Sequence, residues 1–208
     1  LPNDISCENL RGQEFNAWAS DGGNPPSHLP TIAFTRMLAG PIDYTPGIFN
    51  IKFNEYKPIN QVNTTLAQQL ALYVVIYSPI QMAADLPEHY QDQAAFQFIR
   101  DVGVDWEQSM VLKGEVGEYV TIARQERGSG NWFLGSITNE EARQLSINTS
   151  FLEPGIKWQA IIYADGPNAH WNDNPTSIVI DTLEVDNNST ITLDLKPGGG
   201  AAISFKPI

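Results

Sequence analysis

Two glutamates near the beginning of the sequence, Glu8 and Glu14, combine a residue type and a spacing that suit acid–base chemistry. They stand six positions apart on either side of Arg11, and the aromatic residues Phe15 and Trp18 follow closely. A carboxyl group in an apolar setting can donate a proton, whereas one in a polar setting stays ionised and can hold a cation. The alternative is that both glutamates are exposed and that Arg11 is their ion-pair partner.

The composition excludes several classes of partner. The 208-residue chain has 12 Lys and Arg against 24 Asp and Glu, and its net charge of -12 would repel a nucleic acid backbone. The longest apolar stretch, residues 70–84, contains Pro79 and Gln81 and is shorter than the ~20 residues that span a bilayer, so we expect no membrane span. A single cysteine, Cys7, excludes an internal disulfide and a cysteine-based metal cluster.

The first half of the sequence predicts helices separated by short apolar segments. Helical patterns cover residues 31–40, residues 64–84 with a kink near Pro79, and residues 93–102. Between the first two, residues 40–49 are apolar but interrupted by Pro and Gly, which is typical of a strand end that runs into a loop. This half therefore predicts an order of strand, loop and helix.

The second half of the sequence has the shorter period of β-strands. Runs with alternating apolar residues, separated by turn-forming residues, cover 109–115, 118–125, 131–138, 142–151, 157–165, 176–185, 189–196 and 200–207. Eight such strands predict two packed antiparallel sheets, that is, an all-β sandwich. The expected inward-facing pairs are Val120 with Ile122, Ile161 with Tyr163, and Ile178 with Ile180.

The two halves together predict a larger protein. The few strand–helix units of the first half cannot bury a sheet on both faces, and such units normally belong to a barrel or a doubly wound sheet. We therefore expect the chain to begin inside a (β/α)8 barrel, in which catalytic residues lie at the carboxyl ends of the strands.

The order of several motifs resembles the end of a glycoside hydrolase family 97 enzyme, in the group that contains bacterial α-glucosidases and α-galactosidases. The motifs that carry the resemblance are ENLRGQEFNAW, FTRMLAGPIDYTPGIF, LAQQLALYVVIYSPIQMAADLPEHY, FQFIRDV, VLKGEVGEYVTIARQ and WFLGSIT. The resemblance runs over nearly the whole chain. It implies a mixed fold class, α/β plus all-β: the last βα units of a (β/α)8 barrel in residues 1–103, followed by a C-terminal antiparallel β-sandwich in residues 104–208.

The resemblance also implies roles for the two glutamates. In the family's pattern the first glutamate of such a pair is a calcium ligand and the second is the general acid, which assigns the ligand to Glu8 and the acid to Glu14. Cleavage of a glycosidic bond needs a second carboxylate that acts on the anomeric carbon or on water. The family has that carboxylate upstream, so we expect this chain alone to be inactive, and a retaining and an inverting mechanism both stay open.

Three further residues could contact a sugar. The ring of Trp18 could pack against a pyranose face, although a single Trp more often belongs to the core. The resemblance implies that His28 and Asp43 lie near the catalytic rim of the barrel, where they could bond sugar hydroxyls. For Asp43 the alternative is a buried ion pair with Arg36.

Together these observations predict a calcium-dependent, exo-acting α-glycosidase of which this chain is the C-terminal portion. Its substrate would be an α-linked oligosaccharide, its partner the N-terminal remainder of the same enzyme, and its location the bacterial periplasm or the cell exterior. The alternative is a non-catalytic module in which the β-sandwich binds carbohydrate or stabilises another domain.

Overall fold

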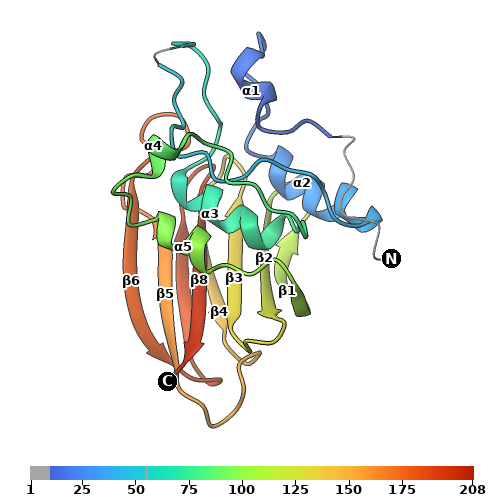
Figure 1. Cartoon of the computed structure of the whole chain (residues 1–208), viewed down its shortest axis with the longest axis vertical. Coiled ribbons are helices and arrows are strands. Elements are labelled where there is room, and N and C mark those ends of the chain that lie inside the picture. The colour runs from blue at the N-terminus through green and yellow to red at the C-terminus, as the bar shows by residue number, and fades with distance from the viewer. Residues whose placement is uncertain (1–9, 55) are drawn as a thin grey trace.

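The second half of the chain folds into two antiparallel sheets in the computed structural model, which describes residues 10–54 and 56–208 (Figure 1). All eight predicted strands are present. They are β1 (Trp106–Glu115), β2 (Tyr119–Glu126), β3 (Trp132–Thr138), β4 (Arg143–Asn148), β5 (Trp158–Asp165), β6 (Ile178–Val185), β7 (Thr190–Leu195) and β8 (Gly200–Pro207).

The two sheets differ greatly in size. The larger one has six strands in the order β1-β2-β3-β8-β5-β6, and the smaller one pairs β4 with β7. Strand β8 therefore lies in the middle of the large sheet, where it pairs with β3 on one side and β5 on the other. Strands β1 and β6 form the two edges.

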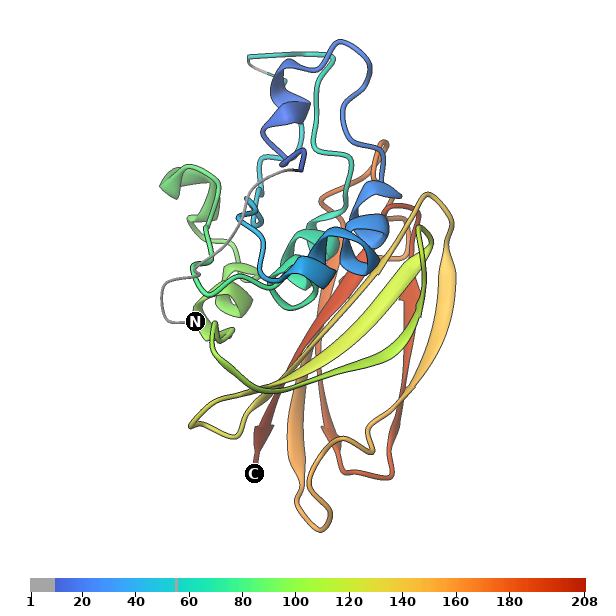
Figure 2. The ribbon, with the colours of Figure 1, turned by 90° about the vertical axis from the view of Figure 1, so that its right-hand side faces the viewer.

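The middle strands of the large sheet are buried on both faces. Because side chains alternate along a strand, Trp132 and Leu134 point to one face of β3 and Phe133 and Ile137 to the other. The first face packs on β4 and β7, and the second packs on the helices of the first half. Figure 2 shows the helices and the small sheet on opposite sides of the large sheet. The molecule thus has three layers, with two hydrophobic cores between them.

The predicted inward pairs are confirmed only in part. Val120, Ile122 and Tyr163 are buried, but against the helical layer rather than the second sheet. Ile161 and Ile178 are half-buried, and Ile180 was wrongly predicted, because its side chain is 39% exposed. Ile180 belongs to edge strand β6, most of which neither the helices nor the small sheet covers.

The first half contains short helices. They are α1 (Phe15–Trp18), α2 (His28–Phe34), the 3-10 helix η1 (Arg36–Ala39), α3 (Leu66–Val75), α4 (Pro87–Tyr90) and α5 (Phe96–Asp101). Helices α2 and η1 correspond to the first predicted helix, and α5 to the third. Among the described residues, no helix is long and apolar enough to cross a membrane.

Two predictions for the first half were wrong. The helix predicted for residues 64–84 ends at Val75, so Pro79 lies beyond it. Helices usually end before a proline, because the residue that precedes proline is disfavoured in a helical conformation. The strand predicted within residues 40–49 is absent. The described residues before β1 form only isolated bridges, which involve Ile42 and the pair Lys52 and Gln61. The barrel units are therefore not visible within this chain.

Helix α3 joins the helical layer to the large sheet. All ten of its residues are buried, and it crosses β3 and β8. Gly135 on β3 permits this approach, since a Cβ atom there would lie 2.5 Å from the carbonyl oxygen of Ala71 and 2.9 Å from Cβ of Val74. The absence of a side chain at Gly135 lets the helix lie directly on the sheet.

Two buried charged residues of the large sheet hold the ends of α3. At its N-terminus, the capping residue Thr65 donates its hydroxyl to Oδ1 of Asp165 at 2.6 Å, and at its C-terminus Nε of Arg124 donates to the carbonyl of Val74 at 2.7 Å. Burial raises the pKa of Asp165 to about 7 and lowers the pKa of Arg124 to about 10. An acidic group at the N-terminus and a basic group at the C-terminus both suit the helix dipole.

Candidate functional site

Glu14 lies in the loop that leads into α1, and its carboxylate is exposed. The hydroxyl of Thr45 donates a hydrogen bond to Oε2 of Glu14 at 3.1 Å. Residues 14 and 45 belong to different segments of the helical layer, so this contact depends on how both segments are held.

A pair of buried glutamines holds both segments on α3. Gln13, which is 3% exposed, donates through Nε2 to the carbonyl of Thr45 and to Oε1 of Gln69 on α3, the latter at 3.1 Å. The same Oε1 of Gln69 accepts the backbone N–H groups of Gly47 at 3.0 Å and Ile48 at 3.1 Å. Helix α3 therefore fixes the neighbours of Glu14 and of Thr45 through one hydrogen-bond network.

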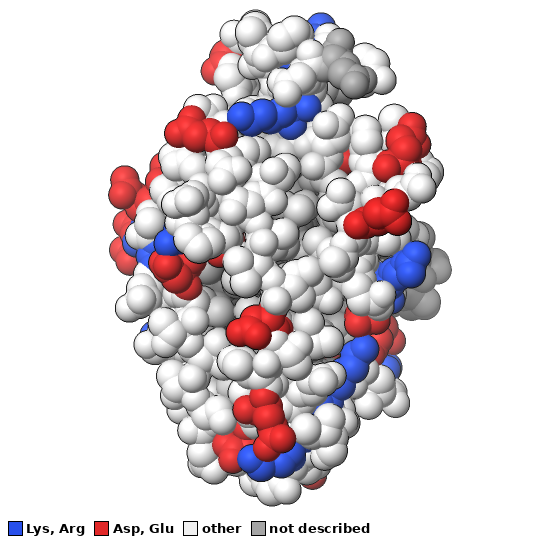
Figure 3. Space-filling view, turned by 90° about the vertical axis from the view of Figure 1, so that its left-hand side faces the viewer, with Lys and Arg blue, Asp and Glu red and all other residues white. Residues whose placement is uncertain are grey.

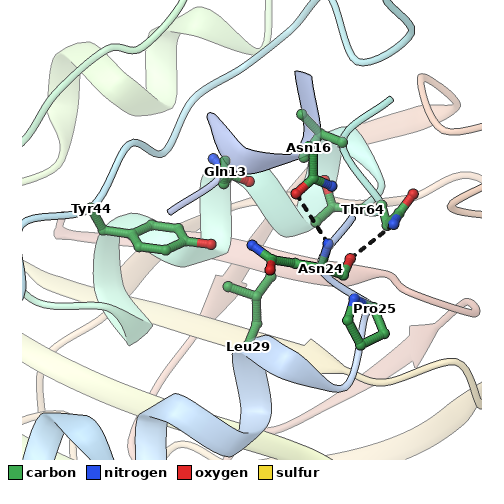
Figure 4. A pocket seen from close by; sticks show the side chains of 9 residues that line it. Gln13, Asn16, Asn24, Pro25, Leu29, Tyr44 and Thr64 are labelled. Carbon is green, nitrogen blue, oxygen red and sulfur yellow. Dashed lines mark hydrogen bonds between the residues drawn. The ribbon is translucent and has the colours of Figure 1, made fainter. Parts of the chain in front are cut away.

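Asparagine side chains hold the other side of the Glu14 loop (Figure 4). Asn24 donates its backbone N–H to Oδ1 of Asn16 at 3.3 Å and its Nδ2 to the carbonyl of Gly12 at 2.9 Å. Asn63 in turn donates Nδ2 to the carbonyl of Asn24 at 2.8 Å. The cavity between these residues and Tyr44 measures about 10 Å³, which is far too small for a sugar, so this cluster supports the loop.

Gly12 leaves the space that the Glu14 carboxylate occupies. A Cβ atom at position 12 would overlap the two carboxylate oxygens of Glu14. The backbone of Gly12 does not have a positive φ, so this glycine is required here for space and not for conformation.

Tyr44 provides a buried neutral group next to the site. Its side chain is 2% exposed, and burial raises its pKa far above the usual value, with a smaller contribution from the negative charge of Glu14. Tyr44 therefore stays protonated, and Asp43 directly before it is half-buried.

The other predicted site residues differ in their exposure and in their contacts. Trp18 is 64% exposed and is not part of either hydrophobic core of this chain. Nε2 of His28 donates to the carbonyl of Arg11 at 3.0 Å, and burial lowers the pKa of His28, so the neutral ring supports the loop that carries Glu14. The guanidinium of Arg11 lies 4.3 Å from the ring centre of Phe15, and Arg11 and Glu14 form no ion pair.

The predicted calcium ligand, Glu8, lies outside the described residues. Within residues 10–54 and 56–208, no group of three or more His, Cys, Asp or Glu side chains is arranged to hold a metal ion.

Sequence reasoning missed Gly12, Gln13, Thr45 and Gln69. Only Gly12 had a local signal, because it stands two positions before Glu14. The contacts of the other three join segments that lie far apart in the sequence, with 32 positions between Gln13 and Thr45 and 56 between Gln13 and Gln69.

Residues 105–206 match a family model described as "Glycosyl-hydrolase 97 C-terminal, oligomerisation". A protein of Bacteroides thetaiotaomicron named "Retaining alpha-galactosidase" is 34% identical over 213 residues, which cover 99% of this chain and 31% of that protein. A "Probable retaining alpha-galactosidase" of Streptomyces bingchenggensis is 27% identical over 202 residues, which cover 97% of this chain and 28% of that protein.

The solved structures that this chain resembles include enzymes of glycoside hydrolase family 97. A glycoside hydrolase family 97 enzyme from Pseudoalteromonas sp. strain K8, in complex with acarbose, is 51% identical and superposes with a TM-score of 0.95 over 100% of this chain and 32% of that chain. A variant of that enzyme in complex with panose is 50% identical with a TM-score of 0.94. A β-arabinopyranosidase at 21% identity and a TM-score of 0.68 shares the fold. The chain thus spans about a third of the length of these relatives.

Proposed function

The chain belongs to glycoside hydrolase family 97, and we propose on this basis that it is the C-terminal portion of an exo-acting glycosidase that hydrolyses terminal α-linked sugars. The observation that carries the proposal is the geometry of Glu14, an exposed carboxylate that a buried amide network holds next to Thr45. A module that only binds carbohydrate through its β-sandwich would not need such a support in the helical layer.

We propose Glu14 as the general acid. Its carboxyl group would protonate the leaving oxygen of the sugar while a second carboxylate, supplied by the part of the enzyme upstream of this chain, acts on the anomeric carbon. Thr45 donates to Oε2, which leaves Oε1 to carry the proton toward the substrate. Relatives named as retaining enzymes support a mechanism in which the second carboxylate is the nucleophile.

The substrate we favour is an α-glucoside. The 50% identical relative was solved with panose, an α-linked glucose trisaccharide, whereas the relatives named α-galactosidases are 34% and 27% identical. We assign Trp18 and Asp43 as candidate sugar contacts, because Trp18 exposes its ring and Asp43 lies two positions before Thr45. His28 contributes indirectly, through the Arg11 carbonyl.

We also propose that the complete enzyme requires calcium and acts in the periplasm or outside the bacterial cell. The family resemblance supports both points. Glu8 would be this chain's ligand, and most of the remaining oxygens would come from elsewhere in the enzyme. A bound calcium ion would help to orient sugar hydroxyls.

This chain alone should bind calcium more weakly than the complete enzyme does, and calorimetry measures both affinities. Micromolar binding by the chain alone would contradict this expectation.

Replacement of Glu14 by Gln in the complete enzyme tests the proposed function. The change keeps the shape of the side chain and removes its proton, so kcat/KM should fall most for natural α-linked oligosaccharides, whose leaving groups need protonation. Activated aryl α-glycosides need less protonation and should lose far less. The measurement is the ratio of the two losses.

Asp181→Asn is a suitable control because Asp181 is an exposed carboxylate on β6. It should leave both rates unchanged. Equal losses for both substrate types in Glu14→Gln would mean that Glu14 holds the site together and that another residue is the acid.

A further inference from the structure

A second polar hollow lies on another side of the helical layer. It measures about 550 Å³ and lies between α4 and the segment before β6, with Asn50, Glu88, His89, Gln93 and Thr176 among its lining residues. A neighbouring hollow of about 350 Å³ shares Gln93 and continues over α5. We call the two hollows together the α4 groove.

The α4 groove is distinct from the surroundings of Glu14. It shares no lining residue with the cavity beside Gln13, and neither Glu14 nor Thr45 lines it. Figure 3 shows this side of the molecule as a largely uncharged surface with scattered Asp, Glu, Lys and Arg side chains. A volume of this size is typical of small-molecule sites.

One buried carboxylate arranges the wall of the groove. Asp85, whose side chain is 8% exposed, accepts the backbone N–H groups of Phe49 and Asn50 on Oδ2, both at 2.7 Å. Its Oδ1 accepts the N–H of Leu86 at 2.8 Å and lies 2.5 Å from Nδ1 of His89. Because Nδ1 is committed to Asp85, the His89 ring offers Nε2 to a ligand in a fixed orientation.

Aromatic packing holds the groove in place from beneath. Tyr90 stacks on Phe96 with ring centres 4.5 Å apart, and Phe49 meets Tyr90 edge to face at 5.0 Å. The Tyr90 hydroxyl donates to the carbonyl of Gly47 at 2.8 Å. A wall that is already ordered loses little conformational entropy when a ligand binds.

The chemistry of the lining selects a class of ligand. Amide, imidazole, hydroxyl and carboxylate groups offer both donors and acceptors, and Leu66 and Ile178 add apolar surface. No Lys or Arg is among the described residues that line the larger hollow, so a ligand with a phosphate or carboxylate would find no cation there. The smaller hollow has one cation, Arg100, which shares it with Asp92. A neutral chain of hydroxyl-bearing rings would form hydrogen bonds with the polar groups and pack against the apolar side chains.

We propose that the α4 groove is a second carbohydrate-binding site, which holds a neutral oligosaccharide away from Glu14. The choice of carbohydrate among neutral hydroxyl-rich ligands rests on the proposed function. The groove would retain long substrates near the enzyme without taking part in the cleavage.

Hydrogen–deuterium exchange of the complete enzyme with maltotriose tests the proposal, with Glu14→Gln as background so that the sugar is not consumed. Binding should slow exchange in residues 47–52 and 86–97, which contain most of the lining residues of the groove. Slower exchange near Glu14 alone, or no change in the groove at saturating sugar, would overturn it. Glucose 1-phosphate serves as the charged probe and should leave the peptides that line the larger hollow unchanged, because no Lys or Arg lines it.

Two substitutions in the same background locate the site. Gln93→Ala removes the side chain shared by both hollows, and Thr176→Val removes a hydroxyl at nearly constant volume. Each should weaken maltotriose binding at the groove by about tenfold, whereas Gln144→Ala, at an exposed position on β4, should not. Binding by both groove variants equal to that of the parent would overturn the assignment.

Folding and function are read separately in these experiments. The melting temperature of each variant shows that the fold is intact. Hydrolysis depends on Glu14 and exchange protection on the groove, so a failure of the proposed acid and a failure of the second site give different results.

Discussion

A glycine two positions before Glu14 determines where its carboxylate lies. The carboxylate folds over Gly12 and from there accepts the hydrogen bond of Thr45. Glu14 could be predicted from the sequence as a candidate acid, because acid catalysis needs a carboxyl group. Its contact with Thr45 could not be predicted, since that contact depends on Gln13 and Gln69, which meet only in the folded chain.

Gly12→Ala should reduce catalysis with little effect on stability. The new methyl group would take the place of the Glu14 carboxylate, which is the far end of a flexible side chain and can move aside at small energetic cost. Displacement of a catalytic group by ~1 Å can cost about 100-fold in rate, so kcat/KM of the complete enzyme should fall by at least about tenfold. Steady-state kinetics and thermal unfolding measure the two effects.

Thr45→Val is the companion variant for Gly12→Ala. It removes the hydroxyl that orients Oε2 of Glu14 without adding bulk beside the carboxylate. The loss of kcat/KM should be smaller than that caused by Gly12→Ala. If Gly12→Ala kept full activity, the observed position of the Glu14 carboxylate would not be the catalytic one.

At the scale of elements, α3 and the strands show what local patterns can predict. All eight strands were predicted, because alternation and turn residues are properties of neighbouring positions. The end of α3 and the absence of a strand within residues 40–49 were not, since an apolar run has the same appearance in a buried helix and in a buried extended segment. Val120 and Tyr163 lie on the face of the sheet that α3 covers. The strand pattern could not predict this face, because it carries no information on the position of α3.

Asp165 should make the stability of the chain depend on pH. Its pKa is about 7 in the folded state against 3.8 in the unfolded chain, so its contribution is fully present below about pH 3.8 and is lost as the pH rises through about 7. The change over this interval is at most about 4 kcal/mol in the free energy of unfolding. Asp165→Asn keeps an oxygen for the N–H groups of Lys196 and Gly200 and carries no charge, so it should remove this decline.

Urea unfolding between pH 5 and 8 measures the effect of Asp165→Asn. Asp181→Asn, on the exposed part of β6, is the matched control and should keep the slope of the parent. A parent and an Asp165→Asn variant with the same pH dependence would show that the hydrogen bonds to Asp165 keep it ionised in the folded state.

At the scale of the whole molecule, the helical half and the sandwich share one of the two cores. Phe133, Ile137 and Tyr163 of the large sheet pack with α3 and α5 and belong to the same cluster as the helices. The sequence predicted two regions that meet near residues 103 and 104 from the change in pattern. It could not predict this shared core, because alternation shows that a strand has a buried face and not what covers it.

Residues 104–208 expressed alone should therefore expose an apolar face. The side chains that α3 and α5 cover would be left in water, so the fragment should bind a hydrophobic dye and melt well below the 208-residue chain. The longer chain should unfold in a single transition. Native-like melting of residues 104–208 without dye binding would show that the sandwich folds independently.

The position of β8 has a consequence for synthesis on the ribosome. Strand β8 follows all other strands in chain order and yet pairs between β3 and β5 in the middle of the large sheet. Until Gly200–Pro207 emerge, β3 and β5 have no partner on their facing edges, and α3 lacks half of the surface it crosses. Because chains grow at about 5–20 residues per second, the helical half must wait several seconds beside an open sheet, a state that offers exposed strand edges to aggregation or to a chaperone.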